Sequence, residues 1–204
     1  MTTLLLVRHG ETDWNAARRI QGSTDIGLNE TGRAQAAAVA DELAERFAHA
    51  RPVVVSSDLA RARDTAVVIA ARLHVAPPRT YRQLRERAYG VAEGMTDVEY
   101  RAQFGDFGRD NVPGAETGAE LRARGVAAVR RIVREARRAH APLDVPVIAV
   151  SHGGMIGQLI RHASGDTLPL PGERLANASV HEFRVERDRL AVLSYAAAPS
   201  RPAA

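Results

Sequence analysis

Three short apolar runs, none of them interrupted by a polar side chain, constrain the fold of this chain more than any other feature. They span residues 4–7 (LLLV), 53–55 (VVV) and 147–150 (VIAV). A strand with one face in water alternates apolar and polar residues, so runs without alternation predict strands that are covered on both faces. Such strands are typical of a parallel sheet with helices packed on both sides.

Helical patterns lie between these runs, with apolar residues at every third or fourth position. Asn29 can cap a helix that starts near Glu30, and Ser57 can cap a second helix, because both side chains can accept a backbone N–H. A third helix is expected from about residue 116 to 140, and a fourth from just after residue 151 to near residue 165. Alternating strands and helices predict the α/β class, here three α/β/α layers around a mostly parallel sheet.

Two further segments complete this scheme. Residues 179–185 and 190–194 predict a hairpin or a pair of edge strands, which gives the sheet a late antiparallel edge. The segment from about residue 84 to 118 is irregular, with a short helix expected after Thr96.

Composition limits the class of protein. All 28 basic residues are arginine, so the high isoelectric point overstates a net charge of only +4. Cysteine is absent, which excludes disulfides, a thiol nucleophile and cysteine metal ligands. No apolar run approaches the roughly 18 residues of a membrane-spanning helix, so we expect a soluble, cytoplasmic protein with no membrane partner. Without a repeat or a linker, a single domain is expected over residues 1–204, with a disordered tail at 196–204.

Polar residues follow each of the three buried runs. Arg8 and His9 come directly after the first run, Arg61 follows the second by about one turn of the next helix, and His152 and Gly153 follow the third. Because ligands of open parallel sheets bind outside the carboxyl ends of the strands, we expect these side chains to meet at one edge. The sequence therefore predicts a site that contains two histidines and at least two arginines.

Phosphoryl transfer is a reaction that uses this combination. Arginine forks suit phosphate oxygens, and a glycine pair before a helix lets backbone N–H groups approach an anion. A histidine such as His9 can attack phosphorus, and nearby arginines keep it neutral and balance the charge of the phosphoryl oxygens. The leaving alkoxide also needs a proton, for which Glu86 in the irregular segment is the first choice, with Asp58 and Glu11 as alternatives.

Four motifs in one order resemble the histidine phosphatase superfamily, also called the phosphoglycerate-mutase-like family. They are RHGETDWN (8–15), SSDLARARDT (56–65), LRERAYG (84–90) and SHGG (151–154). The segment IQGSTDIGLNETG (20–32) is also similar to the one that follows the family's first motif.

The resemblance implies a role for each of these residues. His9 is similar to the phosphorylated nucleophile, and Glu86 falls on the proton donor. The implied phosphate cage consists of Arg8, Arg61 and His152. The implied phosphate-pocket and substrate-side positions are Asn15, Gln21, Gly22, Ser23, Arg87, Tyr89 and Gly153. Members of the family need no metal, and no metal-binding spacing stands out in this sequence, so we expect no cofactor for this chain.

The resemblance leaves two reactions open. In a phosphatase, water attacks the phosphohistidine, whereas a mutase passes the phosphoryl group to another hydroxyl of a retained sugar acid. Arg87 and Tyr89 resemble the pattern of cofactor-dependent phosphoglycerate mutases, where such side chains contact the substrate. Residues 98–113 are short for a mutase lid, and PGAET (113–117) is similar to a stretch of the smaller broad-specificity phosphatases. Since a short lid excludes water poorly, we favour the phosphatase and keep the mutase as the alternative.

A small phosphorylated metabolite is the partner that this interpretation predicts. RNA binding through the basic run at 130–138 is a lower alternative, and aromatic residues at only 4% argue against it. A catalytically inactive phosphoester-binding protein is another, but both histidines and Glu86 are present. The identity of the metabolite and the oligomeric state stay open, and a homodimer is compatible with the sequence.

Overall fold

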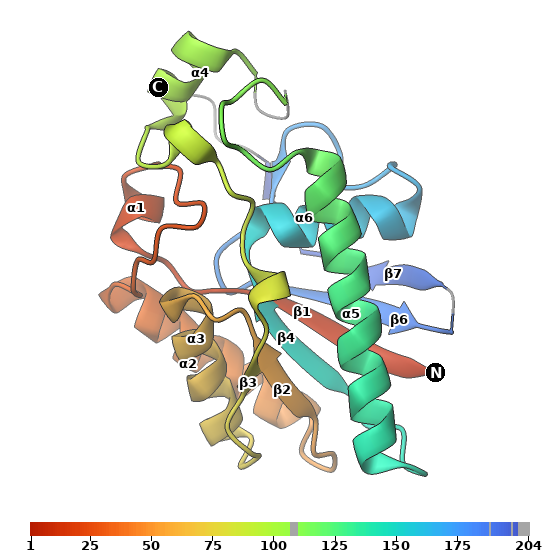
Figure 1. Cartoon of the computed structure of the whole chain (residues 1–204). Coiled ribbons are helices and arrows are strands. Elements are labelled where there is room, and N and C mark those ends of the chain that lie inside the picture. The colour runs from red at the N-terminus through yellow and green to blue at the C-terminus, as the bar shows by residue number, and fades with distance from the viewer. Residues whose placement is uncertain (107–109, 188, 197, 200–204) are drawn as a thin grey trace.

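A six-stranded sheet forms the centre of the computed structural model, which describes residues 1–106, 110–187, 189–196 and 198–199 (Figure 1). The strands follow the order β3-β2-β4-β1-β6-β7. The first four are parallel, and they are β1 (Thr2–Arg8), β2 (Val53–Ser56), β3 (Arg79–Thr80) and β4 (Val147–Ser151). The three uninterrupted apolar runs are thus three neighbouring strands, and the predicted α/β class is confirmed.

The late antiparallel edge is also present. β6 (Val180–Val185) pairs antiparallel with β1, and β7 (Leu190–Ser194) pairs antiparallel with β6. A second, two-stranded sheet joins β5 (Glu173–Arg174) to β8 (Ala198–Pro199).

Part of the segment expected as a disordered tail has backbone partners in this structure. Ala198 and Pro199 form β8, and the Ala196 N–H donates to Nδ1 of the buried His181 at 3.2 Å, so backbone hydrogen bonds hold this part of the chain. The rest of the predicted tail, residues 197 and 200–204, lies outside the described residues.

Helices cover both faces of the sheet, as the apolar runs predict (Figure 1). Leu4 and Leu6 of β1 point into the core under α5 and α6, whereas Leu5 and Val7 point into the core under α2 and α3. Successive strand residues face opposite sides, so an apolar run without alternation supplies both cores at once. The four covering helices are α2 (Glu30–Arg46), α3 (Ala60–Arg72), α5 (Gly118–His140) and α6 (Gly153–Ser164).

The helix α3, which follows β2 in the chain, begins later than the sequence predicts. Asn29 caps α2 as predicted and accepts the Gly32 N–H at 2.8 Å. Ser57 does not cap α3, because the chain stays extended through Leu59. The first N–H of α3, from Ala60, instead donates to the carboxylate of Asp25 at 2.7 Å.

The other two helix starts lie within two residues of the prediction. Thr117 and Glu120 form a capping box that starts α5 at Gly118 rather than near residue 116. At the start of α6, His152 occupies the cap position without a side-chain cap hydrogen bond, and Gly165 ends this helix in a left-handed conformation with φ of 63°. The ring of His152 is therefore not used to cap the helix.

The irregular middle segment is packed as a small core of its own. Its members are Ile20, Ala92, Tyr100 and Val112. The 3-10 turn η2 (Gly90–Ala92) and the helix α4 (Asp97–Phe104), the short helix expected after Thr96, supply Ala92 and Tyr100 of this core. The other short elements are α1 (Asp13–Ala16) and the 3-10 turn η1 (Arg82–Leu84), whose Leu84 belongs to the core under α5 and α6. In the described part of the chain, no helix has the length and apolar character needed to cross a bilayer.

Candidate active site

The carboxyl ends of β1, β2 and β4 lie side by side. Arg8 is in register with Ser151, and Ser56 is in register with Val150. The residues that follow these strands therefore meet at one edge of the sheet, as the sequence predicts. Three of them are almost fully buried, namely His9, Arg61 and His152.

A single hydrogen bond fixes the tautomer of His9. Its Nδ1 lies 2.6 Å from the carbonyl oxygen of Gly10, and because a carbonyl can only accept, Nδ1 carries the proton. Nε2 then keeps its lone pair. Burial and the charges of Arg8 and Arg61 hold the pKa of His9 well below the usual 6.5, so the ring is neutral at neutral pH.

The ring of His152 meets the ring of His9 edge to face, with 5.1 Å between their centroids. Burial, followed by the charge of Arg61, also lowers the pKa of His152 far below its usual value. Neither ring nitrogen of His152 has a hydrogen-bond partner among the described residues. Buried polar atoms without partners cost free energy, and so these two indicate a polar ligand.

The two arginines are anchored by backbone carbonyls. Arg61 donates to the carbonyl oxygens of Gly22 and Thr24, both at 2.9 Å, and Arg8 donates to the carbonyl oxygen of Leu175. Burial lowers the pKa of Arg61 to about 10, which leaves it charged at neutral pH. The buried Nε atoms of both arginines lack a partner in the described structure, so each keeps a donor for a ligand.

Glu86 lies at the start of α6. Its carboxylate accepts the backbone N–H of Gly154 at 2.9 Å, of Met155 at 3.0 Å and of Arg87 at 2.9 Å. The sequence predicts that N–H groups of the glycine pair at 153–154 approach a ligand. In this structure the Gly154 N–H is instead bound by the carboxylate of Glu86. The positive end of the helix dipole stabilises a negative charge at this place.

The two alternative acids point elsewhere. Asp58 forms a bidentate ion pair with Arg85 at 2.7 and 2.6 Å, and this hydrogen bonding lowers the pKa of Asp58. Glu11 accepts from the side chain of Asn29 at 3.0 Å, at the start of α2. Of the three candidates, Glu86 is the one whose charge acts on both Arg8 and Arg61.

The predicted substrate-side segment borders the site. Gln21 is buried and its Oε1 atom has no partner among the described residues. Gly22 has a positive φ of 54°, and a Cβ atom there would lie 2.2 Å from Glu93. Ser23 is exposed and lines a cavity of about 350 Å³ together with Glu86.

The remaining predicted residues are tied to protein partners. Asn15 Oδ1 accepts from the backbone and hydroxyl of Thr12, and Gly153 packs against Arg8. Arg87 is 7% exposed, and it donates to the backbone oxygen of Glu116 at 2.6 Å and to Asp110 at 3.0 Å. Its guanidinium also lies over the Tyr89 ring at 5.3 Å, and burial raises the pKa of that phenol. In this structure Arg87 and Tyr89 therefore contact each other and the 110–116 segment.

Sequence reasoning missed two residues that shape the site. Glu93 accepts from the N–H of Ser23 at 2.8 Å, of Thr24 at 3.0 Å and of Tyr89 at 3.1 Å. Asn177 donates to the carbonyl oxygen of His9 at 3.1 Å and to Asn15 Oδ1 at 3.2 Å. Glu93 and Asn177 bind residues that are far away in the sequence, and so no local spacing predicts these contacts.

No three His, Asp or Glu side chains gather into a set of metal ligands in the part of the chain that the structure describes.

Comparisons with known proteins identify the family of this chain. The family model described as the histidine phosphatase superfamily (branch 1) matches residues 4–198. The chain is 34% identical to the uncharacterized phosphatase PhoE of Bacillus subtilis, over 96% of this chain and 94% of that protein. It is 35% identical to phosphoglycerate mutase-like protein 4 of Arabidopsis thaliana, over 89% of this chain and 79% of that one.

A solved structure gives the same result. The mycobacterial glucosyl-3-phosphoglycerate phosphatase Rv2419c, in its complex with VO3, superposes with a TM-score of 0.80 at 30% identity, over 97% of this chain and 100% of that chain. The chain therefore belongs to the histidine phosphatase superfamily, as a phosphatase of its branch 1.

Proposed function

We propose that this protein hydrolyses phosphomonoesters through a phosphohistidine on His9. One observation carries the proposal. Four buried nitrogen atoms around the neutral His9 ring have no hydrogen-bond partner among the described residues, and they are Arg8 Nε, Arg61 Nε and both ring nitrogens of His152. A phosphoryl group has enough oxygen atoms to accept from the two arginines and from the N–H of His152 at once.

The first step forms the covalent intermediate. The Nε2 lone pair of His9 attacks phosphorus and the bond from phosphorus to the ester oxygen breaks. Glu86, in its protonated form, gives its proton to the leaving oxygen, so the alcohol departs uncharged. Arg8 and Arg61 balance the negative charge that is spread over the phosphoryl oxygens.

The second step reverses the role of Glu86. A water molecule attacks phosphorus, its proton passes to the Glu86 carboxylate, and the bond from phosphorus to His9 breaks. Inorganic phosphate leaves, and both residues return to their starting state. Because two arginines supply the positive charge for both steps, we propose that the reaction needs no metal ion.

We further propose that the substrate is a small phosphorylated hydroxy acid. The solved relative is named for glucosyl-3-phosphoglycerate and the plant relative is phosphoglycerate mutase-like. The cavity beside Glu86 supports an acidic leaving group through Arg82, because the other two arginines that line it are paired, Arg85 with Asp58 and Arg124 with Glu116. A cationic side chain at this place suits a carboxylate on the alcohol that departs.

The mutase alternative lacks support from the side chains that suggested it. Arg87 binds Glu116 and Asp110 in this structure, and so its guanidinium does not face the cage. We therefore keep hydrolysis as the proposed reaction.

Phosphate release from 3-phosphoglycerate and from 4-nitrophenyl phosphate tests the proposal, for the native protein and for His9→Ala, with and without EDTA. We expect turnover that EDTA leaves unchanged and that His9→Ala abolishes. An acid-labile label on the native protein after brief exposure to ³²P-labelled substrate would locate the intermediate. Activity that survives His9→Ala contradicts the mechanism, loss of activity with EDTA contradicts metal independence, and isomerisation of 3-phosphoglycerate that outpaces phosphate release supports the mutase.

A further inference from the structure

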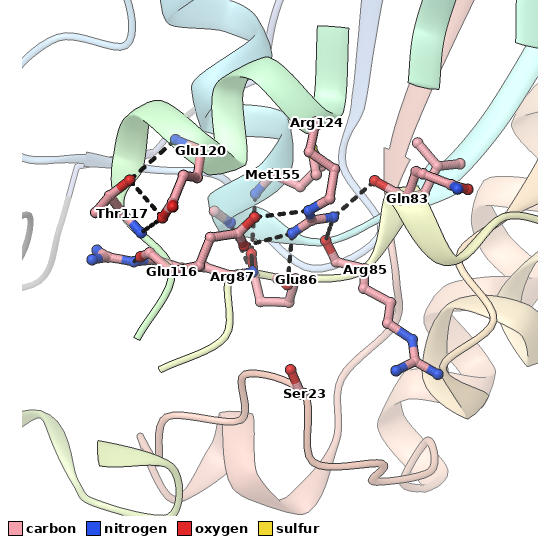
Figure 2. A network of polar contacts seen from close by, with 12 residues as sticks. Ser23, Gln83, Arg85, Glu86, Arg87, Glu116, Thr117, Glu120, Arg124 and Met155 are labelled. Atoms are coloured by element: carbon pink, nitrogen blue, oxygen red, sulfur yellow. Dashed lines mark hydrogen bonds and ion pairs between the residues drawn. The ribbon is translucent and has the colours of Figure 1, made fainter. Parts of the chain in front are cut away.

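We propose that Arg124 is a positioning residue, which holds the backbone of the proton donor Glu86 in place from the neighbouring helix α5. The inference rests on the proposed function, since it concerns the acid of that mechanism. Figure 2 shows Arg124 reaching from α5 to the segment that carries Glu86.

Every N–H of the Arg124 guanidinium has an acceptor. Nη1 donates to the carbonyl oxygens of Gln83 at 2.8 Å and Arg85 at 3.0 Å, and Nη2 donates to that of Glu86 at 3.2 Å. Nε and Nη2 also donate to the two carboxylate oxygens of Glu116 at 2.8 and 2.7 Å. An arginine has five N–H donors, so this side chain is fully used.

The segment that carries Glu86 needs a hydrogen-bond donor for its backbone carbonyl groups, because it is neither a long helix nor a strand. Residues 85–88 follow the single turn η1, and their backbone oxygens have no ladder to join. Arg124 replaces that ladder by donating to the carbonyl oxygens of three residues within a stretch of four. Glu116 adds a second tie, since its own N–H donates to the carbonyl oxygen of Ala88 at 2.8 Å.

The two ends of Glu86 are therefore fixed by different helices. Arg124 of α5 binds its backbone, while the N–H groups of Gly154 and Met155 in α6 bind its carboxylate. No hydrogen bond joins Arg124 to that carboxylate in the described structure, which makes Arg124 a residue that acts through Glu86. A general acid must lie within hydrogen-bond reach of the leaving oxygen, so fixing its backbone contributes to the rate.

Two substrates with different leaving groups separate this role from a general effect on folding. An alkyl phosphate such as 3-phosphoglycerate needs a proton on its leaving oxygen, whereas 4-nitrophenolate leaves without one. Loss of positioning should therefore slow the alkyl ester and spare 4-nitrophenyl phosphate. A damaged fold or phosphate cage should slow both substrates alike.

The experiment compares kcat and KM for both substrates in Arg124→Gln and Arg124→Lys. The matched control is Arg122→Gln, because Arg122 lies on the same helix and donates to Gln158 at 3.0 Å and to Asp166 at 3.0 and 2.6 Å, and none of these bonds reaches the segment that carries Glu86. We expect Arg124→Gln to lower kcat for 3-phosphoglycerate by roughly 10²-fold, the scale of a displaced catalytic group, and to change kcat for 4-nitrophenyl phosphate by less than about 3-fold. Arg124→Lys should fall between Arg124→Gln and the native protein, and Arg122→Gln should leave both substrates unchanged.

Glu86→Gln completes the design. Its kcat should show the same selective loss, and the double variant with Arg124→Gln should be no slower than Glu86→Gln alone, because both changes remove one function. Equal losses on both substrates, or additive losses in the double variant, would overturn the inference. If Arg124→Gln does not fold, Arg124→Lys carries the same comparison. Failure of Glu86→Gln itself to discriminate between the substrates would instead count against the proposed function.

Discussion

Replacing Gly154 by alanine tests whether the carboxylate of Glu86 must lie at the start of α6. A Cβ atom at this position would lie 2.5 Å from Glu86 Oε1, and ordinary contact begins at 3.4 Å, so the oxygen has to retreat by about 0.9 Å. The hydrogen bonds from the N–H groups of Gly154 and Met155 are then lost or lengthened. A catalytic group displaced by about 1 Å can cost on the order of 10²-fold in rate, or about 2.7 kcal/mol of activation free energy.

The same change should affect stability very little. Loss of a capping interaction at a helix start costs about 1 kcal/mol, and alanine in place of glycine in a helix returns about 0.5–1 kcal/mol. The displaced carboxylate belongs to a long side chain that can move without shifting the backbone. We therefore expect the free energy of unfolding of Gly154→Ala to stay within about 1 kcal/mol of the native value.

Gly157 provides the control on the same helix. A Cβ atom there has no heavy atom within 4 Å, so Gly157→Ala should stabilise the protein by about 0.5–1 kcal/mol and leave kcat unchanged. Urea unfolding measures the stability of both variants, and phosphate release from 3-phosphoglycerate measures their kcat. The reasoning is refuted if Gly154→Ala keeps native activity toward this alkyl ester, or if Gly157→Ala loses as much.

Three further predictions concern the histidines and the substrate-side loop. The pKa values of His9 and His152 lie well below 6.5, so their ring resonances in an NMR titration of the free protein should not shift between pH 8 and 6; a midpoint near 6.5 for either ring contradicts its buried environment. Burial lowers the pKa of His181 to about 4, so the unfolded chain binds its proton first, and the stability from neutral His181 is complete above pH 6.5 and is lost as the pH falls towards 4. The free energy of unfolding of His181→Gln should therefore fall less steeply over this range, and equal slopes in the two proteins would count against it. Glu93→Gln should weaken the hold on residues 22–24 and raise KM several-fold with little change in kcat, whereas an unchanged KM would mean that the loop does not contact the substrate.

The group of side chains at the carboxyl ends of the parallel strands could be predicted from the sequence, because its position follows from a local pattern and one topological rule. Uninterrupted apolar runs identified the parallel strands, and parallel strands bring the residues that follow them together. The same rule predicts that His9, Arg61 and His152 lie together at one edge of the sheet.

Long-range contacts could not be predicted in the same way. The first N–H of α3 is bound by Asp25, and the start of α6 is bound by Glu86, which lies 68 residues before Gly154. A local capping signal such as Ser57 is misleading when a distant carboxylate takes its place. The role of Arg124 could not be predicted for a different reason. All 28 basic residues of this chain are arginine, so the residue type alone does not distinguish Arg124 from the others.

The alternation of β1 between two cores divides the enzyme into two parts that can change separately. In the proposed mechanism, α3 carries Arg61 and so contacts the phosphoryl group, whereas α5 and the start of α6 hold Glu86 on the side of the departing alcohol. The strand that leads to His9 is packed by both layers. Libraries that seek a new substrate should therefore vary the α5–α6 side but keep His152 at the start of α6, so that the choice of alcohol can change while the residues proposed to bind the phosphoryl group stay intact.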